Sequence, residues 1–341
     1  MSVKVQPDQR GIVHSRVRRG VYFLANDHIL DLTITFLNSF RAHNPFSDLC
    51  LIPFDNDIDR LTELADTYGF DIYRDETMLQ RADTLGELFF EKHCGQFRKL
   101  CAFEGPFDEF IYIDCDTIVL HDVYFTFQLL DHYDFIASHS DAQHLQKWVW
   151  KATIHDAGLL DREQIEFSAN TGYFCSRKGL LTMTGSEHSI ESSREVWAHF
   201  QPCWEQAALN FLVVTSGARY TSLCKLNRDS SGWRLPLERW AGSRDGMLSA
   251  FSRRKRHAKP DPLLIHWAGS WSPLAIEWKL YRHLKALGFR VKPPRISCFL
   301  RNNWLWKHYR EIPAPQLNAR RGPLPYAQRS DARPDHPPER E

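Results

Sequence analysis

Two aspartates one residue apart, Asp114 and Asp116, are the side chains in this sequence best placed to do chemistry. They stand between two apolar runs, residues 110–113 (FIYI) and 117–120 (TIVL). Side chains two residues apart along a strand point to the same face, so both carboxylates are expected to face one point. Carboxylates in apolar surroundings are costly to bury without a partner, and their oxygens bind hard divalent cations. The pair therefore predicts a metal site at the end of a strand.

The same spacing occurs at Asp55, Asp57 and Asp59, after another apolar run. These acids open a predicted helix, where the helix dipole favours negative charge. A calcium-binding loop over 55–66 is excluded because Arg60 occupies the turn position that needs glycine. We interpret this second group as a helix start.

The elements that must position Asp114 and Asp116 follow from hydrophobic periodicity. Short apolar runs predict buried strands at 21–25, 49–52, 70–73 and 110–113, and helical spacing predicts helices at about 26–40, 57–68 and 85–101. Strands that alternate with helices indicate an α/β fold with a mostly parallel central sheet and helices on both faces. Ligands of such sheets bind beyond the carboxyl ends of the strands, so the residues after 25, 52 and 113 should line one crevice.

Bulk properties narrow the functional classes. The 341 residues carry 43 basic and 42 acidic side chains, which gives no case for a nucleic-acid partner. The eight cysteines include no CxxC pair and are expected to be buried, reduced thiols. Residues 1–19 lack the apolar stretch of a secretory signal, and no run of about 18 apolar residues occurs to span a membrane. We expect a cytoplasmic protein, with peripheral contact at the membrane inner face left open.

Five patches in family order resemble glycosyltransferase family 8, the glycogenin and lipopolysaccharide galactosyltransferase type. They are Lys99, the Asp-x-Asp strand at 110–120, Asn170-Thr-Gly172, Glu205-Gln206-Ala-Ala-Leu209-Asn210, and the segment from His266 through Gly269 to Pro273, within roughly residues 20 to 275. Three positions depart from the family pattern, where glutamate replaces aspartate at Glu205, serine replaces lysine at Ser272 and leucine replaces tryptophan at Leu274. The resemblance therefore places the chain in a divergent branch.

The resemblance implies a GT-A fold (a Rossmann-like nucleotide-diphospho-sugar transferase) and retaining transfer of a sugar from a nucleotide diphosphate, with UDP as the expected nucleotide. It implies metal ligands Asp114, Asp116 and His266, nucleotide contacts at Lys99 and Asp114, donor-sugar contacts at Asn170, Gly172 and Gly269, and catalytic roles for Glu205 and Gln206. Further nucleotide contacts are expected at Ala25, Asn26 and Asp27, which end and follow the first predicted strand. The expected organisation is an extension at 1–19, one catalytic domain at 20–311 and a disordered tail rich in proline and arginine at 312–341. The domain divides into a nucleotide-binding half at 20–125 and a half for the donor sugar and the acceptor at 126–311, with C-terminal helices.

Several of these assignments have plain structural alternatives. Asn26 and Asp27 could equally cap a helix, His266 could be a core histidine of a strand, and Glu205 could lie on the surface of an ordinary helix. The basic run at 253–259 is either a solvated loop or a phosphate-binding segment, and the aromatic stretch at 299–309 either packs in the core or contacts a lipid-linked acceptor.

Two carboxylates and one imidazole suit Mn²⁺ better than Mg²⁺, which prefers oxygen ligands. A bound cation would stabilise the leaving diphosphate as a Lewis acid. The partners expected are a nucleotide-sugar donor and an unidentified carbohydrate, lipid-linked or protein acceptor. Residues 24–28 (LANDH) lack the glycine-rich loop of a dehydrogenase or nucleotidyltransferase. The competing function is a catalytically silent nucleotide-sugar-binding or interaction protein on the same fold.

Overall fold

The structure, a computed structural model, describes residues 17–141, 143–231, 234–240, 262–267, 282–290 and 305–314. Its strands are β1 Arg19–Ala25, β2 Leu49–Pro53, β3 Asp71–Ile72, β4 Glu109–Ile113, β5 Thr117–Val119, β6 Phe135–Ala137, β7 Tyr173–Arg177, β8 Tyr220–Ser222, β9 Leu237–Trp240 and β10 Pro262–His266. Its α-helices are α1 Leu30–His43, α2 Asp59–Tyr68, α3 Glu76–Phe90, α4 Gln143–Val149, α5 Arg162–Phe167, α6 Met183–Ser192, α7 Arg194–Trp197, α8 Gln206–Thr215 and α9 Leu223–Asp229. The 3-10 helices are η1 Asp27–Ile29, η2 Gly95–Phe103, η3 Tyr124–Asp131 and η4 Ala152–His155, and 282–286 and 305–311 are also helical.

The described strands form two sheets. The larger has seven strands in the order β3-β2-β1-β4-β7-β6-β8, and the smaller has the order β5-β10-β9. In the larger sheet β7 runs antiparallel to β4 and β6, and the other neighbouring strands are parallel. The predicted α/β class with a mostly parallel central sheet is therefore confirmed.

The chain changes direction across the sheet between β1 and β4. From β1 it proceeds outward through β2 to β3, and then returns to add β4 on the other side of β1. Such a switch point is where ligands bind in open α/β sheets, beyond the carboxyl ends of the strands. Asn26 directly follows β1 and Asp114 directly follows β4, so both lie at this edge.

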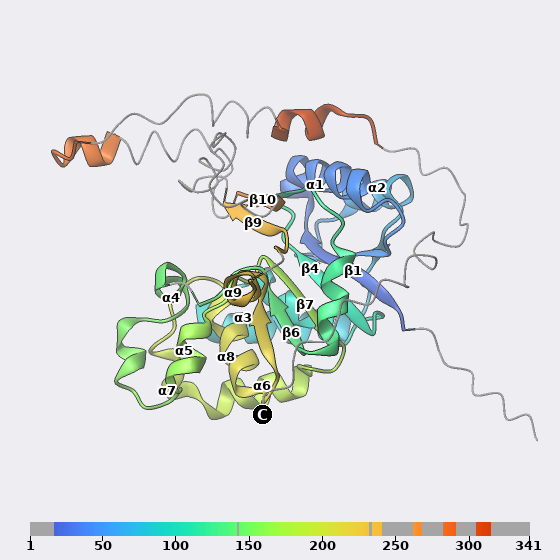
Figure 1. Cartoon of the computed structure of the whole chain (residues 1–341). Helices are drawn as coiled ribbons and strands as arrows, with labels where there is room; N and C mark the ends of the chain where they lie inside the picture. Colours follow the sequence, from blue (N-terminus) through green and yellow to red (C-terminus); the bar gives the residue numbers. More distant parts are fainter. Residues whose placement is uncertain are drawn as a thin grey trace, which may run out of the picture.

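Helices cover both faces of the larger sheet (Figure 1). Along β1, Tyr22 and Leu24 pack in a cluster with residues of α3, α6 and α8, whereas Val21 and Phe23 pack with residues of α1 and α2. A strand buried on both faces reads as a continuous apolar run, which is why residues 21–25 were recognisable. Burial of each large apolar side chain stabilises the fold by about 1.5–3 kcal/mol.

The helix predicted at 85–101 is wrong. The chain forms α3 and then, after a break, η2. The Asp75 carboxylate caps α3 by accepting from the Met78 amide, and Glu91, with a φ of 54°, ends it in the left-handed region. The sequence concealed this end because glutamate, unlike glycine, is uncommon there. By contrast, the end of α2 at Gly69, with a φ of 63°, was predicted correctly.

Other predictions concern the chain as a whole. The seven cysteines in the described residues are all free, and five of them are buried. Among the described helices, none has the length and apolar character needed to cross a bilayer. The predicted extension at 1–19 and tail at 312–341 fall almost wholly outside the described residues.

Candidate active site

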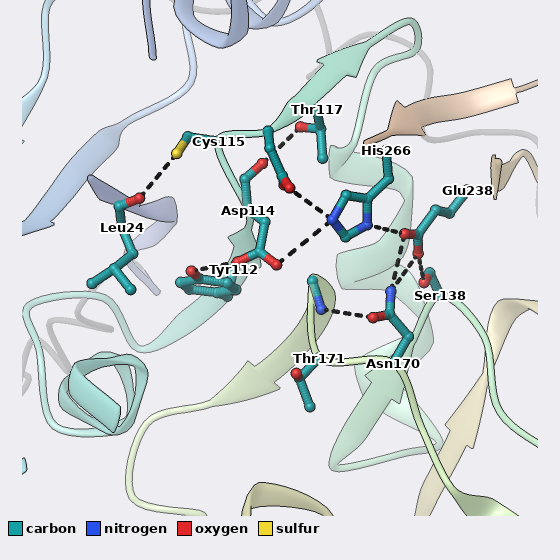
Figure 2. Close-up of polar contacts among 12 residues, drawn as sticks. Leu24, Tyr112, Asp114, Cys115, Thr117, Ser138, Asn170, Thr171, Glu238 and His266 are labelled. Atoms are coloured by element: carbon teal, nitrogen blue, oxygen red, sulfur yellow. Dashed lines mark hydrogen bonds and ion pairs between the residues drawn. The ribbon is translucent and has the colours of Figure 1, made fainter. Parts of the chain in front are cut away.

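Asp114, Asp116 and His266 come together at the switch point, and we refer to these three side chains as the metal cluster (Figure 2). One possible ligand atom from each lies within 4.8 Å of the other two. The Nε2 atom of His266 is 3.0 Å from Oδ1 of Asp116 and 3.8 Å from Oδ2 of Asp114. The structure thus brings together the three residues that the resemblance implies as metal ligands, although His266 lies 150 residues beyond Asp116 in the sequence.

The two aspartates lie in a turn between the two sheets. β4 ends at Ile113 and β5, which begins at Thr117, belongs to the smaller sheet, so the aspartates do not share a strand face as predicted. The turn is fixed at both ends, since the Asp114 amide donates to the Gly172 carbonyl at 2.8 Å and the Trp267 amide donates to the Asp116 carbonyl at 2.9 Å. Because the turn joins the sheets, it directs both carboxylates toward His266 on β10.

His266 is oriented by a carboxylate that the sequence analysis missed. Its Nδ1 lies 2.5 Å from Oε1 of Glu238, whose side chain is fully buried on β9. When Nδ1 donates its proton to this carboxylate, the lone pair of Nε2 faces the two aspartates. Metal-binding histidines have this arrangement, in which a carboxylate behind the ring fixes the tautomer.

The charge of the site also suits a cation. The metal cluster contacts Glu238 and Lys99, and Lys99 in turn contacts Glu205. The site therefore holds four carboxylates and one ammonium. Their formal charges sum to −3 when His266 is neutral. The Glu205 and Glu238 side chains are buried and those of Asp114 and Asp116 are 26% and 27% exposed, so this excess of negative charge is costly without compensation. Burial lowers the pKa of His266, but the neighbouring carboxylates of Asp116 and Glu238 more than offset this and raise that pKa well above its ordinary value. The donor set and the charge therefore both fit a divalent cation.

Lys99 links the metal cluster to Glu205. Its Nζ lies 3.0 Å from Oδ1 of Asp114 and 2.7 Å from Oε1 of Glu205, and the Thr171 hydroxyl donates to the same Glu205 oxygen at 2.8 Å. Burial lowers the pKa of Lys99, but the two carboxylates outweigh it, so that this pKa lies above its ordinary value and the side chain stays charged. Glu205 is therefore not on a helix surface but buried beside the metal cluster.

The Asn170–Gly172 segment forms the floor of the site. The side-chain amide of Asn170 donates to both carboxylate oxygens of Glu238, at 2.9 and 3.0 Å. A Cβ on Gly172 would lie 2.5 Å from Cε1 of His266 and 2.8 Å from Oδ2 of Asp114, so the site is closed to any larger side chain here. Gly172 thus lies against the metal cluster and Asn170 against Glu238, whereas Gly269 is outside the described residues.

The polar residues after β1 that were predicted to contact the nucleotide form hydrogen bonds within the protein. The Asp27 carboxylate accepts from the amides of Arg60 and Leu61, at 2.8 and 3.0 Å, and so caps α2. The helix cap expected for the stretch that follows Asn26 and Asp27 is therefore wrong, because Asp27 caps a neighbouring helix. Asn26 instead donates from its amide to Asp55 at 2.7 Å.

Ala25 and Gln206 are the remaining predicted residues. Ala25 is buried, and its carbonyl accepts from the Phe54 amide at 2.9 Å. Gln206 is the first residue of α8, and its side-chain amide donates to the backbone carbonyl of Trp148 at 3.3 Å. Its side chain thus contacts the end of α4 rather than Lys99.

Sequence reasoning missed the support behind the metal cluster, namely Tyr112, Ser138, Thr171 and Glu238. The Tyr112 hydroxyl donates to Asp114 at 2.8 Å, and the Ser138 hydroxyl donates to Glu238 (Figure 2). The available signal was an acid in the run Leu-Glu-Arg-Trp at 237–240. That run does not reveal its partner, because the pairing of β9 with β10 is a tertiary feature.

No protein-family model and no curated protein matches the sequence. Among solved structures, the chain is similar to the glycosyltransferase GlyE of Streptococcus pneumoniae TIGR4, with 15% identity, a TM-score of 0.48, and coverage of 89% of this chain and 62% of that one. It is also similar to the galactosyltransferase LgtC in complex with donor and acceptor sugar analogs, with 14% identity, a TM-score of 0.48, and coverage of 80% and 97%. Both are GT-A glycosyltransferases.

A third solved structure is glucosyl-3-phosphoglycerate synthase from Mycobacterium tuberculosis in complex with Mn²⁺, UDP and glucosyl-3-phosphoglycerate. It has 14% identity, a TM-score of 0.35, and coverage of 60% of this chain and 70% of that one. The chain spans only 62% of the length of GlyE. At these identities and TM-scores the similarities assign no activity to this chain, so the function must be argued from the site itself.

Proposed function

We propose that this chain is a metal-dependent glycosyltransferase of a divergent family 8-like branch. It moves a sugar from a nucleotide diphosphate donor, a UDP-sugar, to an acceptor with retention of configuration. The observation that supports this most strongly is the metal cluster at the switch point, with Glu238 behind His266. This edge of the sheet is where a nucleotide would bind, and the ligand set is one that holds a cation against phosphate oxygens.

In this proposal Asp114, Asp116 and His266 hold Mn²⁺ or Mg²⁺, with Mn²⁺ preferred because one ligand is an imidazole. When bound, the cation stabilises the negative charge of the departing diphosphate as a Lewis acid. Lys99, held charged beside Asp114, contributes a second positive charge to the same region.

The chain's other residues position the sugar. Glu205 is fixed by Lys99 and Thr171, and its carboxylate stabilises the positive charge that develops on the sugar. Gln206 orients the acceptor, and Asn170 and Gly172 line the donor-sugar pocket. Retaining transfer requires no general base here, because the departing phosphate oxygen takes the acceptor proton on the same face.

Donor hydrolysis tests the proposal without knowledge of the acceptor. Purified protein incubated with UDP-glucose or UDP-galactose should release UDP slowly with Mn²⁺ and not with EDTA. A silent nucleotide-sugar binder would instead be stabilised thermally by Mn²⁺ and UDP but would release no product. Absence of hydrolysis with all common nucleotide-sugar donors would contradict the transferase, and a thermal shift without hydrolysis would point to the silent binder.

We also propose a cytoplasmic location, consistent with free cysteines, which are typical of reducing compartments. Peripheral contact with the membrane inner face belongs to the same proposal. Cell fractionation tests both, because a cytoplasmic protein appears in the soluble fraction and a peripheral one is released from membranes by high salt.

A further inference from the structure

A cavity of about 510 Å³ lies at the same edge of the larger sheet as the metal cluster. We call it the polar pocket, and the described residues that line it are Asp141, Gln146, Glu166, Lys225 and Arg228. Asp141 follows β6, and Lys225 and Arg228 lie on α9, which follows β8. β8 is parallel to β6, and both run in the direction of β4 because β7 is antiparallel to β4 and to β6. The pocket is therefore at the carboxyl edge, where ligands of such sheets bind.

The segment from Ser138 to Asp141 links the polar pocket to the metal cluster. The Ser138 hydroxyl donates to the carboxylate of Glu238, which in turn holds Nδ1 of His266. Three residues later, the Asp141 amide donates to the Phe167 carbonyl at 3.0 Å, which fixes Asp141 at the wall of the pocket. Four residues of chain and one carboxylate thus connect this wall to the third predicted metal ligand.

Polar contacts also join two walls of the pocket to each other. The Asp141 carboxylate accepts from the Ser140 hydroxyl, whose oxygen lies 2.9 Å from Oγ of Ser222. The Ser222 side chain caps α9 by accepting from the Lys225 amide at 3.1 Å. The backbone that carries Asp141 and Lys225 is therefore held in place without a ligand, which lowers the cost of ordering it on binding.

Every side chain that lines the polar pocket ends in a hydrogen-bonding group, and both donors and acceptors are present. The carboxylates of Asp141 and Glu166 only accept, whereas the cations of Lys225 and Arg228 only donate. The amide of Gln146 does both. Because the formal charges of the four ionised side chains cancel, the pocket favours a ligand that is polar but carries no net charge.

The mixed lining separates three classes of ligand. A hydroxyl group both donates and accepts, so a sugar ring can satisfy the carboxylates and the cations together. A phosphate would meet Lys225 and Arg228 but would be repelled by the carboxylate of Asp141. An alkyl chain would leave all the lining groups buried without partners. The volume of the pocket also lies within the range of about 300–1,000 Å³ that is usual for small-molecule sites.

We propose that the polar pocket holds a neutral sugar unit of a carbohydrate acceptor, through hydrogen bonds between the sugar hydroxyls and the lining side chains. This inference rests on the proposed glycosyltransferase function and names its acceptor class. The position of the pocket, linked through Glu238 to His266, places this sugar beside the site assigned to the donor. A lipid or protein acceptor without a sugar does not fit the lining.

The test uses the full-length chain, fluorescently labelled, on a printed array of neutral glycans and their sialylated or sulfated counterparts, with Mn²⁺ and UDP present. The neutral glycan that binds most strongly is then titrated against Lys225→Met and Glu166→Leu. Lys178→Met is the control for the first variant, because Lys178 is exposed and follows β7 at the opposite edge of the sheet. Glu163→Leu is the control for the second, because Glu163 is exposed on the same helix, α5.

We expect Lys225→Met and Glu166→Leu each to bind the glycan about tenfold more weakly or worse, as when a hydrogen bond to a charged group is lost. Both control variants should bind it as the unmodified chain does. The melting temperature of each variant without ligand reports that it is folded.

Three results would overturn the proposal for the polar pocket alone. They are binding confined to the acidic glycans, equal binding in the pocket and control variants, and no glycan binding by a chain that is stabilised by Mn²⁺ and UDP. Loss of the Mn²⁺ and UDP response in the unmodified chain would instead count against the proposed function.

Discussion

The buried carboxylate of Glu238 lies 2.5 Å from Nδ1 of His266, on the opposite side of the ring from the two aspartates. The two residues come from adjacent strands, β9 and β10 of the smaller sheet. This sheet also includes β5, which directly follows Asp116. One small sheet therefore positions His266, the carboxylate behind it and one end of the aspartate turn.

Glu238→Gln should weaken Mn²⁺ binding about 10- to 100-fold, the usual effect of removing a partner behind a metal-bound histidine. The amide can still accept from Nδ1, but it lacks the charge that makes the imidazole a better donor to a metal. Isothermal titration with Mn²⁺ in the presence of UDP measures the change. Glu109→Gln is the matched control, because Glu109 is also buried but contacts Arg19 and Arg177 away from the site. Equal Mn²⁺ affinity in the two variants would show that Glu238 is only a structural residue.

Gly172→Ala should damage the metal cluster directly. The added Cβ would lie 2.5 Å from Cε1 of His266, so the ring or the floor of the site must move. We expect a loss of about 1–3 kcal/mol in the free energy of unfolding, typical of overpacking, together with weaker Mn²⁺ binding. Urea unfolding and Mn²⁺ titration measure these two effects. Unchanged values in both would mean that the floor of the site is not in contact with His266.

Lys99→Met should destabilise the chain by about 3–5 kcal/mol, because it leaves the buried Glu205 carboxylate and the partly buried Asp114 carboxylate without their shared cation. Glu205→Gln in the same chain removes one of those charges, so the double variant should lose less than the sum of the single losses. A double-mutant cycle in urea measures this coupling, which is expected at about 0.5–3 kcal/mol. Additive losses would contradict a direct Lys99–Glu205 ion pair.

Asp27→Ala should cost about 1 kcal/mol of unfolding free energy, the usual effect of losing a helix cap, since this carboxylate holds the first amides of α2. Thermal unfolding of the variant, compared with that of Asp66→Ala on the exposed face of α2, measures it. An identical stability of the two variants would argue against the cap. A separate loss of UDP affinity in Asp27→Ala would support the nucleotide contact predicted from its place after the first strand.

The strands could be predicted because a strand buried on both faces is a continuous apolar run, as at Val21–Ala25. The aspartate pair could be predicted because two acids within an apolar run have few structural explanations. Glu238 could not, since its importance depends on which strand lies beside β9. The end of α3 at Glu91 was also hidden, because a left-handed glutamate has no local sequence signal. Local patterns thus indicated the two aspartates, whereas tertiary pairing decided which carboxylate stands behind His266.

The central claim is that Asp114, Asp116 and His266 hold one divalent cation. Electron paramagnetic resonance of Mn²⁺, titrated against the chain with UDP, tests it most directly because free and bound Mn²⁺ are counted separately. Asp57→Asn is the matched control, since Asp57 has the same acid spacing but lies exposed before α2. We predict one bound Mn²⁺ in the unmodified chain and in Asp57→Asn, and none in Asp116→Asn or His266→Ala. Full Mn²⁺ binding in the last two variants would contradict the account.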